Sequence, residues 1–185
     1  MFTLSITTGW LKYLLGWLAV FLIRLIPFLP PNFEPMLATV MPFSGRYGVL
    51  GSFLFGFLGI LVFDVFTSGI GMWTWITAGM YGALGIGAHV FFKRYEATTL
   101  NFVAYGLIGT LVYDIVTGLS IGPLFYGQSF MSALVGQIPF TAMHLTGAAL
   151  FAVVLSPALH KWVVQNDVLE IPVLWNRVSA LVSSR

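Results

Sequence analysis

The chain alternates long apolar runs with short breaks that are rich in proline, glycine or charged residues. The apolar runs cover residues 10–29, 36–44, 47–67, 72–92, 100–118 and 130–159. A helix needs about 20 mostly apolar residues to cross a bilayer, and every run except 36–44 approaches or meets this length. The pattern therefore predicts transmembrane helices. The run 36–44 is either a short, tilted or partly re-entrant segment, or it joins the next run as one long broken helix.

The positions of the basic residues favour six spans over five, because cytoplasmic loops carry an excess of Lys and Arg. A five-span arrangement would place Arg46 in mid-membrane. With six spans and a cytoplasmic N-terminus, the outer loops 30–35, 68–71 and 119–129 contain no basic residue, and only Arg24 lies toward the outer side. The other basic residues are then cytoplasmic: Lys12, Arg46, Lys93, Arg94, Lys161, Arg177 and Arg185.

These patterns predict an all-α integral membrane protein with both termini in the cytoplasm. We expect a six-helix membrane domain over residues 1–160, in which the second helix is short. The more polar residues 161–185 are expected to form a cytoplasmic C-terminal tail, with a short interfacial helix near 173–182. The segment LPPNFEP at 29–35 has three prolines, which fix the backbone angle φ, so it is expected to be a stiff outer loop.

Composition supports the membrane assignment and excludes several functions. Only 8% of residues are charged and 58% are apolar, with a mean hydropathy of +0.94, whereas soluble domains carry about 25% charged residues. The chain has no cysteine, and its net charge of +2 includes no basic patch for nucleic acid. No nucleophile elbow, zinc-protease motif or phosphate-binding loop occurs. We therefore expect a protein that is not an enzyme and that holds no metal or cofactor.

A twelve-residue pattern that contains an aspartate occurs twice in this apolar chain. GFLGILVFDVFT at 56–67 recurs as GLIGTLVYDIVT at 106–117, which aligns Asp64 with Asp114 and Thr67 with Thr117. A carboxylate facing lipid costs about 2.5–3.5 kcal/mol at mid-bilayer, so both aspartates are expected to face the protein interior or an outward cavity. Alternatively, each aspartate holds loop backbone at a helix end while each threonine bonds back to a carbonyl of its own helix.

Other polar and aromatic residues fall at the same predicted outer level, which suggests a small-molecule pocket with apolar walls and few polar groups. We expect Asp64 to support the pocket and Asp114 to contact the solute. Alternatively, the tryptophans and Tyr126 form an interfacial aromatic belt, and His144 makes an interhelical hydrogen bond. The predicted substrate-binding residues are Asn32, Glu34, Asp64, Thr67, Trp73, Trp75, Asp114, Thr117, Tyr126, Gln128 and His144.

Four segments together resemble a substrate-binding (S) component of an energy-coupling-factor (ECF) transporter. They are PNFEP at 31–35, GRYGVLGSFLFGFLGILVFDVFTSG, WTWITAGMYGALGIGAHVF and IPFTAMHLTGAALFAVVLSP. The resemblance covers residues 10–160 and implies six helices, a vitamin site open to the outside and a capping loop at Pro30–Pro35. It also implies docking to a transmembrane coupling (T) component that carries two ATPase subunits. The first helix departs from the family, because it lacks the Ala-xxx-Ala pattern at which the coupling protein packs.

The sequence thus favours a solute-capture subunit of an ABC importer for vitamin uptake, in the inner (plasma) membrane. The carboxylates and indoles favour a neutral or cationic solute with a flat ring or several hydroxyls, such as a cobalamin-like compound, a thiamine-type precursor or a modified-nucleobase precursor. A non-catalytic membrane scaffold or cell-envelope protein is the alternative. An intramembrane enzyme is the third possibility, but it requires a nucleophile or metal constellation that the sequence does not contain.

Overall fold

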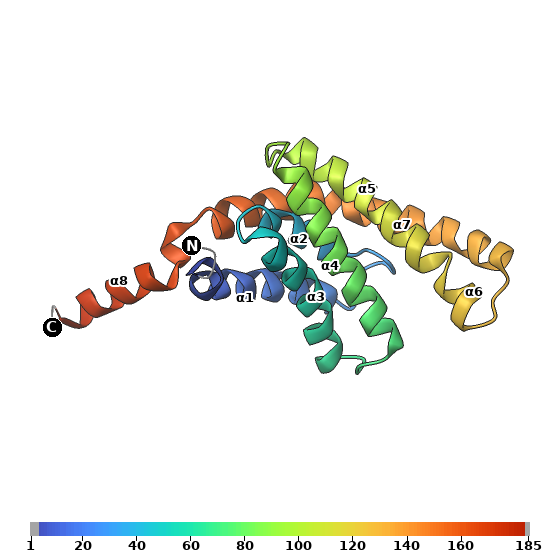
Figure 1. Ribbon diagram of the computed structural model, residues 1–185, viewed down its shortest axis with the longest axis horizontal. Helices are drawn as coiled ribbons and strands as arrows, with labels where there is room; N and C mark the ends of the chain where they lie inside the picture. The colour runs from blue at the N-terminus through green and yellow to red at the C-terminus, as the bar shows by residue number, and fades with distance from the viewer. Residues whose placement is uncertain (1–3, 184–185) are drawn as a thin grey trace.

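The computed structural model describes residues 4–183, which form helices joined by short loops (Figure 1). No strand occurs in this part of the chain. Arg185, predicted to be cytoplasmic, lies outside the described residues, as does the side chain of Arg177. The helices are α1 (Leu4–Arg24), α2 (Met36–Ser44), α3 (Gly48–Phe66), α4 (Met72–Phe92), α5 (Thr99–Gly118), α6 (Ile121–Phe125), α7 (Phe130–Leu159), a π-helical turn (His160–Val164), a 3₁₀ turn (Asp167–Leu169) and α8 (Ile171–Ser183).

Among the described residues, four helical segments are long and apolar enough to cross a membrane: Gly48–Phe66, Met72–Phe92, Thr99–Phe125 and Phe130–Val164. This is the make-up of a multi-pass helical membrane protein. Helix α2 has only nine residues, and α1 is not among the four, so the count of six spans and the side on which the termini lie stay predictions.

The predicted boundaries of the first span were wrong. Helix α1 begins at Leu4 and ends at Arg24 instead of covering 10–29, although the apolar run continues past its end. Pro27 explains the early stop, because a proline disfavours helical backbone at the residue before it and cannot donate a helical hydrogen bond. The loop that precedes α2 therefore spans residues 25–35 and is longer than predicted.

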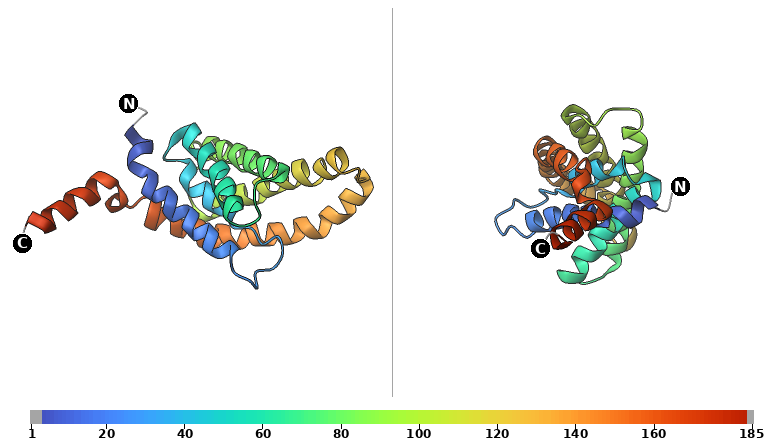
Figure 2. Two further views of the ribbon diagram at one scale, coloured as in Figure 1. Left: turned by 90° about the horizontal axis from the view of Figure 1, so that it is seen from below. Right: turned by 90° about the vertical axis from the view of Figure 1, so that its left-hand side faces the viewer.

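Two helical hairpins form most of the molecule: α3 pairs with α4, and α5 pairs with α7 (Figures 1 and 2). The α3–α4 pair is held at very short range by two glycines. A methyl group built on Gly56 would collide with the carbonyl of Tyr81, and one on Gly85 would collide with the carbonyl of Ser52. The two backbones therefore touch, as is common where small residues line a membrane helix interface.

Helix α2 lies at the centre of the molecule, and all nine of its residues are buried. It contacts α3, α4, α5 and α7, so it is covered by both hairpins. The carbonyl oxygen of Ser44 at its C-terminal end accepts a hydrogen bond from Ser52 Oγ at 2.8 Å, and His89 Nδ1 lies 2.7 Å from the same oxygen. Ser156 Oγ of α7 donates to the Ala38 carbonyl at 2.7 Å. Side chains of three neighbouring helices thus satisfy backbone groups that a short buried helix would otherwise leave unpaired.

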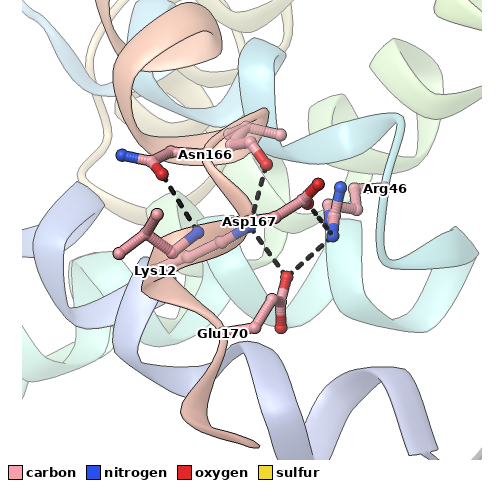
Figure 3. Close-up of polar contacts among 7 residues, drawn as sticks. Lys12, Arg46, Asn166, Asp167 and Glu170 are labelled. Carbon is pink, nitrogen blue, oxygen red and sulfur yellow. Dashed lines mark hydrogen bonds and ion pairs between the residues drawn. The ribbon is translucent and has the colours of Figure 1, made fainter. Parts of the chain in front are cut away.

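A network of ion pairs joins the segment after α7 to α1 and to the α2–α3 loop (Figure 3). Lys12 Nζ of α1 is fully buried and lies 2.8 Å from Glu170 and 3.0 Å from the Val164 carbonyl. Arg46 Nη2 lies 2.7 Å from the same Glu170 carboxylate and 3.5 Å from Asp167. Beyond this network, α8 extends away from the body of the molecule (Figure 1), and its bounds agree with the helix predicted near 173–182.

Candidate functional site

A cavity of about 470 Å³ lies where the C-terminal ends of α1 and α3 and the N-terminal part of α4 meet the loop 25–35, with α5 and α7 on its other side. Its wall combines polar and aromatic groups, which is typical of small-molecule sites. The polar residues are Arg24, Asn32, Glu34, Asp64, Thr67, Ser68, Thr77 and His144. The apolar and aromatic residues are Ile60, Phe63, Trp73, Tyr81, Tyr113 and Phe140.

The loop 25–35 is held over the cavity by a charged residue near each end. Arg24 Nε lies 3.3 Å from Glu34 Oε2, while Glu34 Oε1 accepts the backbone N–H of Met36 at 2.9 Å and so caps the start of α2. The Arg24 guanidinium also lies 4.0 Å from the centroid of the Phe63 ring, a cation–π contact with α3. A smaller hollow on another side of the loop shares Arg24, Asn32 and Glu34 with the main cavity. The loop is therefore fixed near both ends, and it contributes Asn32 and Glu34 to the wall of the cavity.

Asp64 lies at the end of α3 and borders the cavity. Its backbone carbonyl accepts the N–H groups of Thr67 at 3.2 Å and Gly69 at 2.7 Å, which closes the turn after the helix. Gly69 has a φ of +78°, a left-handed conformation that favours glycine. The residue is only 9% exposed, and its carboxylate has no hydrogen-bond or ion-pair partner among the described residues. The backbone of Asp64 thus builds the turn, and its side chain is left for the cavity.

Asp114 lies behind the cavity wall instead of in it. His144 Nδ1 of α7 donates to Asp114 Oδ1 of α5 at 2.8 Å, and both residues are almost fully buried. The Tyr113 ring stands edge-on to the His144 ring, with centroids 5.7 Å apart, and lies against Tyr81 at 4.9 Å. This layer joins the α5–α7 hairpin to α4 and holds His144 at the cavity. The interhelical hydrogen bond expected as the alternative role of His144 is therefore present.

The structure brings six of the predicted residues together around the cavity: Asn32, Glu34, Asp64, Thr67, Trp73 and His144. Asp114, which was expected to contact the solute, lies one layer behind them. Thr67 and Thr117 both donate to the carbonyl four residues earlier, at 2.8 Å, as the alternative interpretation of the repeat expected. Thr117 is buried and does not line the cavity.

Three other predicted residues lie away from the cavity. Trp75 is two positions after Trp73, which rotates it by about 200° around α4, and its ring instead lies 6.3 Å from that of Phe57. Tyr126 and Gln128 lie at the turn between α6 and α7, the far end of the α5–α7 hairpin in Figure 1, and both are exposed. A shared predicted depth in the membrane did not place them at the same site, because depth alone does not fix the direction around a helix.

Sequence reasoning named Arg24 as reaching this level but missed most of the apolar and aromatic wall. The signal was present as helical spacing, because residues three, four and seven positions apart share a face. On α3 this face carries Ile60, Phe63, Asp64 and Thr67; on α4 it carries Trp73, Thr77 and Tyr81; on α7 it carries Phe140 and His144. Extending each predicted polar residue along its own helix face would have found these positions.

The fold and site define a class: a multi-pass helical membrane protein with a cavity that has a polar and aromatic wall. Among the described residues, no group of three metal-ligating side chains could hold a metal ion. Comparison with known protein families, with curated proteins and with solved structures finds no match to this chain.

Proposed function

We propose that this chain is the solute-capture subunit of an ECF-type ABC importer in the inner (plasma) membrane. In this proposal the cavity opens to the outside, binds a vitamin or a related small molecule, and releases it inside when the chain is coupled to a transmembrane coupling protein and two ATPases. The chain itself carries out no catalysis. The observation that supports this best is the cavity whose wall includes Asn32 and Glu34, because both residues belong to the segment Pro30–Pro35 that the family resemblance implies as a cap.

The size and wall of the cavity suit a small solute with a ring. Its volume is about 470 Å³. Known ligand pockets cover about 300–1,000 Å³. Of the solutes considered above, this volume favours a thiamine-type or nucleobase-type compound over a cobalamin-like one.

Two tryptophans on α4 offer a matched test. Trp73 borders the cavity and Trp75 does not, although they are 47% and 52% exposed and lie on the same helix. The purified chain, equilibrated with a small-molecule extract of its source cells and washed, should retain a compound detectable by mass spectrometry. Trp73→Ala should lower that retention about tenfold, which corresponds to about 1.4 kcal/mol of binding free energy. Trp75→Ala should leave it unchanged.

The same preparation separates capture from the scaffold alternative. An affinity-tagged chain expressed in its source cells should co-purify with a coupling protein and ATPases. A scaffold would retain no solute and would keep its cellular role in the variants Asp64→Asn, Asp114→Asn and Glu34→Gln. If neither a retained compound nor a coupling complex is found, the proposal is wrong.

A further inference from the structure

The ionisable groups around the cavity leave it with a net negative charge. Arg24 is the only cation in its described wall apart from a protonated His144, and it lies 3.3 Å from Glu34, which compensates it. Asp64 has no compensating partner among the described residues. The His144–Asp114 pair is neutral overall when His144 is protonated and adds a second negative charge when it is not. In either protonation state, Asp64 leaves the site with an excess of negative charge.

The carboxylate of Asp64 is placed where a ligand charge would compensate it. The residue is only 9% exposed, it borders the cavity, and the turn held by its own backbone carbonyl fixes its position. A carboxylate that is partly withdrawn from water and has no partner is stabilised by a cation brought next to it. A bound cation would thus supply the positive charge that the described residues do not place next to Asp64.

The aromatic wall favours the same kind of ligand. Phe63, Trp73, Tyr81, Tyr113 and Phe140 surround the space beside Asp64. Aromatic faces attract cations and stack with flat rings. The one permanent cation of the described wall is the Arg24 guanidinium, whose Nη1 is buried. An anionic solute would find this single guanidinium already engaged by Glu34 and Phe63.

Building on the proposed function, we propose that the captured solute is a flat heterocycle or aromatic ring that carries a positively charged nitrogen, with Asp64 as its counter-ion. The ring stacks within the aromatic wall. A carboxylate- or phosphate-bearing solute is excluded by the same charges.

The test identifies the solute and its dependence on Asp64 in one experiment. The full-length chain and the variants Asp64→Asn, Asp64→Glu and Asp167→Asn are purified in detergent, equilibrated with a small-molecule extract of the source cells and washed. Retained compounds are then identified by mass spectrometry. Asp167 is the matched control, because its side chain is 81% exposed and lies in the tail. Size-exclusion profiles establish that each variant is folded.

The expected result is a retained ring compound with a basic or quaternary nitrogen. Its retention should fall about tenfold or more in Asp64→Asn, recover in part in Asp64→Glu, and be unchanged in Asp167→Asn. A neutral or anionic retained compound overturns the inference and leaves the proposed function intact. Equal retention of a cationic compound by Asp64→Asn and by the unmodified chain has the same two consequences. If no form of the protein retains any compound, the proposed function fails, and this inference fails with it.

Discussion

We predict that substituting either residue of the buried Lys12–Glu170 pair lowers the stability of the fold, but by different amounts. Replacing Glu170 by Ala leaves the Lys12 ammonium with no ion-pair partner and only the Val164 carbonyl at 3.0 Å, in a site where the lysine side chain is 0% exposed. Replacing Lys12 by Met removes the buried charge itself. The remaining Glu170 carboxylate is 15% exposed and keeps Arg46 at 2.7 Å. The two substitutions break the same contact but leave very different groups behind.

The magnitudes follow from what remains buried. Removing one partner of a buried ion pair costs about 3–5 kcal/mol, and we place Glu170→Ala near 3 kcal/mol because Glu170 is partly exposed. Lys12→Met loses its bond to Glu170, which keeps Arg46, and its bond to the Val164 carbonyl, at a cost of about 1–2 kcal/mol. In the double variant the unpaired lysine is gone, so its cost should fall below the sum of the two single costs by about 1–2 kcal/mol.

Reversible unfolding in mixed micelles with increasing sodium dodecyl sulfate, followed by tryptophan fluorescence, measures these differences. Asp167→Ala is the control, because it removes only the exposed end of the network, at 3.5 Å from Arg46, and it should change stability by less than about 0.5 kcal/mol. The reasoning is refuted if Lys12→Met costs as much as Glu170→Ala, or if the double variant is simply additive.

Two further predictions concern the same network and the α3–α4 interface. Burial raises the pKa of Glu170, but hydrogen bonds and charges from Lys12 and Arg46 outweigh it and hold the pKa below the ordinary 4.5. The ionised carboxylate therefore stabilises the fold at pH values above 4.5. In acid unfolding curves, the difference in stability between the unmodified chain and Glu170→Ala should become smaller as the pH falls through the lowered pKa. A difference that stays constant with pH would contradict this. Gly56→Ala should lower stability by about 1–3 kcal/mol because the methyl group meets the Tyr81 carbonyl. Gly79→Ala, which points into open space, should be neutral or stabilising by up to about 1 kcal/mol, and equal melting temperatures for the two variants would argue against close backbone contact.

Apolar runs and breakers predicted the long helices but not every helix end, and they missed the short helix α6 (Ile121–Phe125), which lies in the predicted outer loop 119–129. The run predicted at 130–159 is α7 to the residue, because Ser129 caps its start by accepting the Ser132 N–H at 3.2 Å. The first span failed because its apolar run continues past Arg24, and apolar character alone does not distinguish a helix from the loop that follows it. Pro27 was the better guide to that helix end.

The two copies of the aspartate pattern show what local sequence leaves undetermined. Asp64 and Asp114 occupy the same position of the repeated pattern, yet one carboxylate is unpaired beside a cavity and the other is bonded to a histidine. The difference comes from His144, which is 30 positions away from Asp114 and reaches it only because α5 and α7 pair. No comparable partner of Asp64 occurs among the described residues. The local pattern predicted a polar residue near each helix end, but the packing of the helices determines whether that residue is paired or borders the cavity.

The central position of α2 has a consequence for how the chain is made. A nine-residue helix is about 14 Å long, at about 1.5 Å per residue, and cannot cross a hydrocarbon core of about 30 Å. It is nevertheless synthesised before α3, α4, α5 and α7, the helices that cover it. Until α7 emerges, the Ala38 carbonyl lacks the Ser156 hydroxyl that pairs with it in the finished fold. The core around α2 therefore stays incomplete through most of translation. It can be completed only after α7, nearly the last helix, has been synthesised.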